Sequence, residues 1–96
     1  MNIGAARITL RISHSRSLKD KRRVSNSLRQ RVGGKFNVSV AEVEMNDAQQ
    51  TLTLGITCVS NSALHASQML DRVMEFIESE RLDAEVVDRE IDVFGF

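Results

Sequence analysis

Residues 51–59 read TLTLGITCV, and residues 60–62, which follow them, read SNS. Apolar side chains alternate in the first stretch with threonine and glycine, as is typical of a β-strand with one buried face. Serine or asparagine in the second stretch can cap a helix, and the apolar side chains of residues 63–77 then recur at helical spacing. The sequence therefore predicts a strand that leads directly into an amphipathic helix.

Further strands are predicted on both sides of this unit. Residues 36–44 alternate, with a break near Ala41 that indicates a bulge or a two-sided environment. Turn-forming residues at 45–50 connect them to the strand over 51–59. Residues 84–94 alternate as well. We expect one side of that last strand to carry Val87, Ile91 and Val93, and the other side to carry Val86, Asp88, Glu90 and Asp92.

The amino-terminal third supplies a second helix. Ser17 and Asp20 match a capping box, which satisfies free amides at a helix start. We expect this helix to run to Val32 and to end at Gly33 and Gly34. Its inward stripe carries Leu18, Lys21, Val24, Leu28 and Val32, whereas Lys19, Arg22, Arg23 and Arg29 lie off that stripe and are predicted to face solvent.

With a further alternating strand over residues 3–13, the elements follow the order β-α-β-β-α-β. Two right-handed β-α-β crossovers in that order give a ferredoxin-like α+β sandwich, in which a four-stranded sheet carries two helices on one face. We expect one domain over residues 1–96, with the first and third strands at the centre of the sheet. The outer sheet face would then carry Arg7, Arg11, the threonines and the acids of the last strand.

Three separated stretches resemble the YlxP-like family of small bacterial domains. They are SLKDKRRV at 17–24, FNVSVAEV at 36–43 and CVSN at 58–61. The resemblance covers essentially the whole chain and implies the same ferredoxin-like fold. It also implies a gene neighbourhood rich in translation and ribosome-maturation factors, which is an association and not a mechanism. The family supplies no catalytic residues that can be carried over.

Charge is divided unevenly along the chain, although the formal net charge is zero. Residues 1–35 hold ten cations and one acid, while residues 36–96 hold three cations and twelve acids. Residues 16–35 alone carry a net charge of +7. Such an arrangement repels itself and points to an external anion, to which backbone amides at the helix start can add. The predicted anion-binding residues are Arg16, Lys19, Arg22, Arg23 and Arg29.

Our leading hypothesis is a non-enzymatic cytoplasmic module that docks this basic helix on ribosomal RNA or a ribonucleoprotein surface, in a translation or ribosome-maturation context. The strands over 3–13 and 51–59 have no aromatic side chain on which bases can stack. Contacts should therefore go to the phosphate backbone. The competing interpretation is that acids of the other helix neutralise the cations within the fold. Those acids are Asp71, Glu75 and Glu78.

A second hypothesis is a homo-oligomeric protein-interaction or small-ligand-binding domain with no role at nucleic acids. The apolar tail at 93–96 either closes the core beside the second strand or offers a patch to a second subunit, so a homodimer is one expectation. Arg7 and Arg11 have a structural interpretation instead, because cross-strand ion pairs with acids of the last strand are within reach.

Enzymatic chemistry has little support in the sequence. His14 and the serines of the loop over 13–17 are the candidates for a small hydrolase, but no carboxylate is placed to orient the histidine. Two histidines and Cys58 fall short of the three or four ligands of a zinc site, and Cys58 alternates onto the core face. We expect no catalytic residue, no metal and no cofactor. Nothing approaches the roughly 20 apolar residues of a membrane span, and a lone cysteine fits the cytoplasm.

Overall fold

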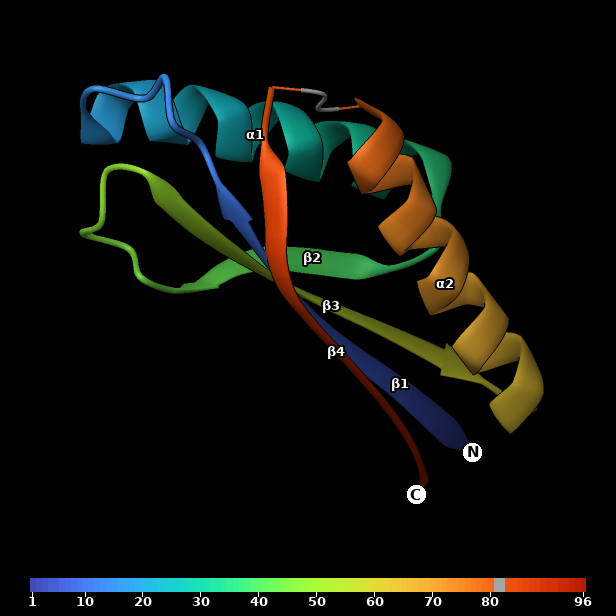
Figure 1. The fold of residues 1–96 in the computed structure, drawn as a ribbon. Coiled ribbons are helices and arrows are strands. Elements are labelled where there is room, and N and C mark those ends of the chain that lie inside the picture. The colour runs from blue at the N-terminus through green and yellow to red at the C-terminus, as the bar shows by residue number, and fades with distance from the viewer. Residues whose placement is uncertain (81–82) are drawn as a thin grey trace.

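The computed structural model describes residues 1–80 and 83–96, and its elements follow the predicted order (Figure 1). The six elements are β1 (Asn2–Arg11), α1 (Leu18–Lys35), β2 (Ser39–Glu44), β3 (Thr51–Ser60), α2 (Ala63–Glu80) and β4 (Glu85–Gly95). Arg81, one of the three cations of the acidic segment, lies outside the described residues. Over the described residues, no helix is both long and apolar enough to cross a membrane.

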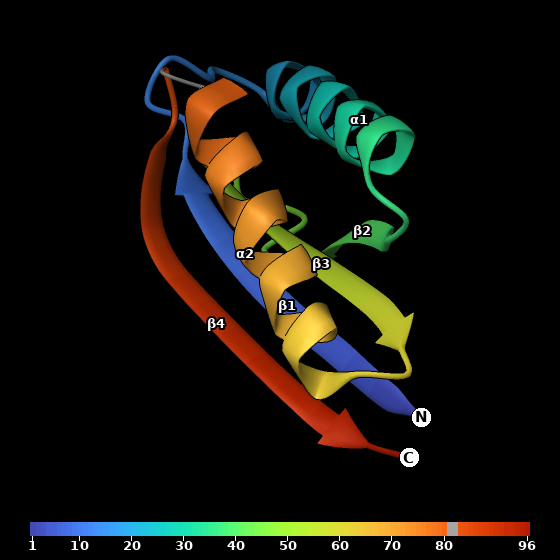
Figure 2. The ribbon, with the colours of Figure 1, turned by 90° about the vertical axis from the view of Figure 1, so that its right-hand side faces the viewer.

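The four strands form one antiparallel sheet in the order β2-β3-β1-β4, as the sequence predicted. Both helices lie on the same face of this sheet, and the opposite face is uncovered (Figure 2). This is the ferredoxin-like α+β sandwich. The termini lie side by side at one end of the sheet, where the Phe96 amide donates a hydrogen bond to the Met1 carbonyl at 2.7 Å.

The helix-facing side of β1 builds the core. Ile8 and Leu10, together with Ile12 directly after the strand, are at most 1% exposed, because alternate residues of a strand point to the same face. Gly4 lies on that side too, and a Cβ there would stand 2.9 Å from both Cys58 Sγ and a methyl of Leu70. The glycine therefore lets α2 approach the sheet closely. The expectation that Cys58 packs in the core is confirmed.

One helix boundary differs from the prediction. α1 continues through Gly33 and Gly34 to Lys35, and neither glycine has a positive φ. The helix ends where the Phe36 amide donates to the Val32 carbonyl at 2.9 Å. Val32 is fully buried, and the Lys35 ammonium lies 6.0 Å from the Phe36 ring centroid. Packing of this last turn outweighs the low helix propensity of glycine, about 1 kcal/mol per residue.

A bulge in β4 reverses the sides of the strand that were predicted for Val86 and Val87. Thr9 pairs with Asp88 and Leu10 with Val86, so Val87 is the extra residue. Val86 therefore turns toward the core and packs against it with Val93, while Val87 is exposed. The prediction that Val86 lies with the acids and Val87 with the core-facing residues was wrong, because simple alternation takes no account of a bulge.

The position of a bulge in β2 and the position of the carboxyl-terminal tail also differ from two expectations. In β2 the register shifts between Glu42 and Glu44, slightly beyond the predicted break at Ala41. The tail runs beside β1 and not beside β2, since β4 pairs with β1 along its whole length. Its two phenylalanines, Phe94 and Phe96, are exposed.

Candidate anion-binding surface

The start of α1 is held by the predicted capping box. Ser17 Oγ accepts a hydrogen bond from the Asp20 amide at 3.1 Å, and the Asp20 carboxylate accepts one from the Arg16 amide at 3.0 Å. The Ser15 hydroxyl, fully buried, donates to the Ser17 carbonyl at 3.1 Å. Ser17 and Asp20 thus already accept from two amides near the helix start.

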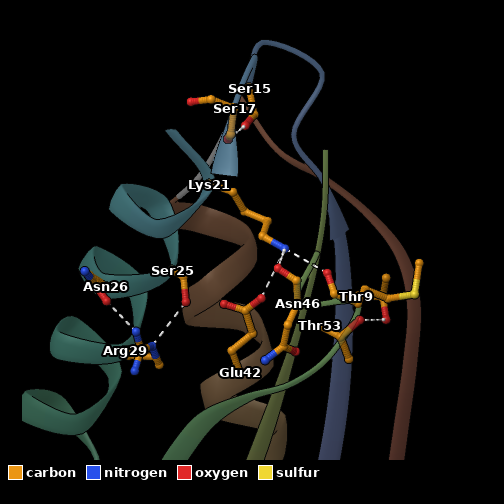
Figure 3. A network of polar contacts seen from close by, with 11 residues as sticks. Thr9, Ser15, Ser17, Lys21, Ser25, Asn26, Arg29, Glu42, Asn46 and Thr53 are labelled. Atoms are coloured by element: carbon orange, nitrogen blue, oxygen red, sulfur yellow. Dashed lines mark hydrogen bonds and ion pairs between the residues drawn. The ribbon is translucent and has the colours of Figure 1, made fainter. Parts of the chain in front are cut away.

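The inward face of α1 carries one cation. The Lys21 side chain is 1% exposed, and its ammonium donates to the carbonyls of Met45 at 2.8 Å and Asn46 at 3.1 Å. It also lies 3.2 Å from Glu42 Oε2. Figure 3 shows this ammonium reaching from α1 to β2 and to the turn that follows it. We call Lys21, Glu42, Met45 and Asn46 the lysine clamp.

The lysine clamp ties the helix to the β2–β3 hairpin. Glu42 Oε2 is buried and has no well-aligned hydrogen-bond donor among the described residues, so the ion pair with Lys21 is what compensates its charge. Met45 has a φ of 57°, a left-handed conformation that costs a non-glycine residue roughly 1–2 kcal/mol. The sequence signal for this clamp was a lysine on an otherwise apolar helical stripe, but its partners in the hairpin were not foreseen.

The outward face of α1 carries the predicted anion-binding cations. Lys19, Arg22 and Arg23 are exposed, as is Arg16 in the loop before the helix. Within residues 1–80 and 83–96, no carboxylate forms an ion pair with any of these four side chains. We call these four residues the outer basic surface.

Arg29, the fifth predicted residue, is placed differently. It is half-buried, its Nε donates to Ser25 Oγ at 3.1 Å, and its guanidinium also donates to Asn26 Oδ1 (Figure 3). Both partners are neutral, so the positive charge remains. The guanidinium is nevertheless held against its own helix, about two turns beyond Arg22.

Among the described residues, one acid of α2 forms an ion pair with α1. Glu78 pairs with Arg89 of β4 at 2.7 Å, and Glu80 pairs with Arg31 near the end of α1. In the described part of the chain, neither Asp71 nor Glu75 forms an ion pair with a cation of α1. Neutralisation by α2 therefore reaches the carboxyl-terminal half of α1 and leaves the outer basic surface without a partner.

Of the two arginines predicted to form cross-strand ion pairs, Arg7 does so within the described residues and Arg11 does not. Arg7 pairs with Glu90 of β4, where both carboxylate oxygens lie 3.0 Å from its guanidinium, and with Glu44 of β2. Hydrogen bonds to Glu44 and then to Glu90 raise the pKa of the Arg7 guanidinium above its ordinary value. Arg11 forms no such pair with a described residue.

The predicted hydrolase candidates lie in the loop before α1. His14 Nε2 lies 3.5 Å from Asp83 Oδ2, so the prediction that no carboxylate is placed to orient this histidine was wrong. The hydroxyls of Ser15 and Ser17 are engaged at the helix start. Among the described residues, no group of three or more His, Cys, Asp or Glu side chains could hold a metal ion.

Comparisons with known proteins identify a family and a fold. Residues 3–91 match the model of a family described as a protein of unknown function, DUF503. A curated protein of Bacillus subtilis (strain 168), described as uncharacterized protein YlxP, is 40% identical over 77 residues, which cover 80% of this chain and 84% of that protein.

Two solved structures share the fold alone. A putative chlorite dismutase superposes with a TM-score of 0.59 at 8% identity and covers 99% of this chain, but the match spans only 45% of that longer chain. A de novo designed protein with a ferredoxin fold superposes with a TM-score of 0.50 at 16% identity, covering 98% of this chain and 84% of the design. By the family model and the 40% identical relative, the chain belongs to the DUF503 family of proteins of unknown function.

Proposed function

We propose that this protein is a non-enzymatic cytoplasmic module that binds the phosphate backbone of RNA, in ribosomal RNA or a ribonucleoprotein, through the outer basic surface. One observation carries the proposal. Four exposed cations gather at the start of α1 without a carboxylate partner among the described residues, although the chain as a whole has as many acids as cations.

The charges of the outer basic surface do not stabilise the folded protein. Lys19 lies three and four residues before Arg22 and Arg23, a spacing at which like charges on a helix repel by a few tenths of a kcal/mol per pair. Arg16 and Lys19 also stand at the positive end of the helix dipole, which costs about 0.3–1 kcal/mol for each cation. A polyanion would relieve both terms, which supports an external partner for these side chains.

The mode of contact follows from which side chains are present. β1 and β3 carry no aromatic residue, so the two central strands of the sheet offer no platform for base stacking. Arginine and lysine on a helix instead reach phosphate oxygens, which give affinity without sequence information. We therefore infer weak sequence preference and strong salt dependence, in the translation or ribosome-maturation context that the family resemblance implies.

The test is binding of the purified protein to ribosomal subunits and to structured RNA across a salt series. We expect the logarithm of the binding constant to fall with the logarithm of salt at a slope of about −3, as for about four phosphate contacts. The double variant Arg22→Glu with Arg23→Glu should lose binding by about a hundredfold or more at low salt, because two attractive contacts become repulsive.

A matched control separates a local site from net charge. The variant Arg11→Glu with Arg72→Glu changes net charge by the same amount, and in the described residues neither arginine has an ion pair. We expect its affinity to fall far less than that of the α1 variant. Equal losses in the two variants, or wild-type binding by the folded α1 variant, would overturn the proposal.

The second candidate function is self-association as a homodimer, and exposed apolar side chains on the uncovered sheet face support it. Val59 is 67% exposed and Phe94 45% exposed at one end of that face, where an apolar patch can meet a second copy. The outer basic surface lies on the helix side, so a charge-driven contact with the acids of the sheet face would be head-to-tail and would not close as a two-fold dimer. Light scattering tests this candidate: a monomer at micromolar concentration would exclude it.

A further inference from the structure

A pocket of about 380 Å³ lies between α2, the end of β3 and the segment after α1. Its α1 side is marked by Asn37, which follows the end of the helix. The outer basic surface lies at the other end of α1, roughly 20–25 Å away at 1.5 Å per helical residue. Figure 2 shows the amino-terminal half of α2 beside the end of β3, and residues of both elements line the pocket. We call this hollow the α2 pocket.

Polar side chains converge on the α2 pocket from two directions. His65, Gln68 and Arg72 come from α2, at positions that share one helix face because they are three and four residues apart. Asn37 comes from the opposite wall. In the described part of the chain, none of these four side chains has a hydrogen bond or ion pair, and no carboxylate lines the pocket.

Apolar atoms supply the rest of the lining. Ala66 is fully buried, Cys58 is 7% exposed, and Met69 packs partly buried against the core. Val59, whose side chain lies on the uncovered sheet face, borders the pocket at its outer edge. A ligand that used only the polar groups would leave this surface facing water, whereas an apolar body would cover it at a gain of about 25 cal/mol per Å².

We propose that the α2 pocket binds a small organic anion, with a carboxylate or phosphate head on Arg72 and an apolar body against Met69 and Cys58. The guanidinium is a planar donor fork that matches either head group. Gln68 and Asn37 provide neutral amide donors for the remaining oxygens. The pocket volume is at the small end of the range of roughly 300–1,000 Å³ found for ligand sites, which limits the occupant to a small molecule.

Two-dimensional amide NMR of the full chain tests the site with defined probes. Hexanoate and hexyl phosphate carry the two head groups on the same apolar chain, and hexanamide is the neutral analogue. We expect saturable shifts at millimolar probe or below, confined to amides of Asn37, residues 58–60 and residues 65–72. The stronger of the two anionic probes identifies the head group. Hexanamide should bind at least about tenfold more weakly, because it lacks the negative charge that strengthens hydrogen bonds from the Arg72 guanidinium.

Variants of the pocket arginine decide the role of the charge. Arg72→Gln should weaken the better anionic probe about tenfold or more, and Arg72→Lys should restore only part of the affinity because the planar fork is lost. Arg11→Gln removes an exposed arginine outside both the pocket and the outer basic surface, and should leave the affinity unchanged.

Three results would overturn the proposal. They are an absence of saturable shifts with both anionic probes, equal binding of hexanamide, and equal affinities of Arg72→Gln and the wild type. Shifts that cluster on residues 16–23 instead would place anion binding on the outer basic surface alone, and would also exclude the α2 pocket as a site.

Discussion

The two faces of α1 carry the same charge and use it in opposite ways. Lys21 points inward, is almost completely buried, and meets two carbonyls and a carboxylate. Arg22 and Arg23, the next two residues, point outward and have no carboxylate partner among the described residues. The difference teaches that the face of the helix, and not the charge itself, decides whether a cation serves the fold or remains available to a partner.

The energetic reason is desolvation. A buried ammonium loses its water and is tolerated only when protein oxygens replace that water with good geometry. An exposed guanidinium keeps its water and needs no partner within the fold. Removing the charge should therefore disturb folding on the inner face and leave folding untouched on the outer face.

The largest expected effect follows removal of the buried ammonium. Lys21→Met should lower the free energy of unfolding by about 3 kcal/mol, because the Glu42 carboxylate loses its described ion-pair partner and the Asn46 carbonyl loses its described donor. Urea-induced unfolding followed by circular dichroism measures the change. A domain of this size has a total stability of about 5–15 kcal/mol, so the variant should still fold.

Two further variants test whether the effect of Lys21→Met comes from the buried charge. Arg22→Met, one residue further on, should change stability by less than about 0.5 kcal/mol. Adding Glu42→Gln to Lys21→Met should restore part of the loss, since an unpaired buried carboxylate is then absent. If Lys21→Met and Arg22→Met cost the same, the contrast between the two faces is wrong.

A smaller effect is expected at the turn that receives Lys21. Met45→Gly should stabilise the protein by about 1 kcal/mol, because glycine adopts the left-handed φ of 57° without strain. The methionine side chain is 51% exposed, so little packing is lost. The hydrogen bonds from Lys21 should persist in the variant, because the carbonyls that accept them are backbone groups. Thermal unfolding measures the gain, and a loss of stability would mean that the left-handed turn carries no strain.

The smallest effect is expected at the end of α1. Gly33→Ala and Gly34→Ala should each stabilise the helix by about 0.5 kcal/mol, because a Cβ at either position meets no atom within 4 Å and both residues are helical. Chemical unfolding of each single variant gives the increment. These substitutions lie far from the outer basic surface, so RNA binding should not change, and a loss of binding would extend the proposed contact to the last turn of α1.

Several features were within reach of the sequence because they depend on near neighbours. Alternation located the strands, helical spacing placed Lys21 inward and Arg22 outward, and Ser17 with Asp20 marked the start of α1. The order of the elements then left few sheet topologies that obey the handedness of β-α-β crossovers.

Other features were out of reach because they depend on residues far apart in the chain. The bulge that turns Val86 toward the core arises from pairing with β1, and the helix continues past Gly33 because tertiary packing outweighs local propensity. The proximity of His14 and Asp83 likewise needs two loops that are distant in sequence.

The sequence by itself determined the ferredoxin-like order of strands and helices and the uneven distribution of charge, since both are properties of local pattern and composition. Only the tertiary structure decided which charges meet. It brought Glu42 to Lys21, Glu78 to Arg89 and Glu80 to Arg31, and it left the outer basic surface exposed. The physical reason is that ion pairing acts over a few ångströms in space, a distance that separation along the chain does not report.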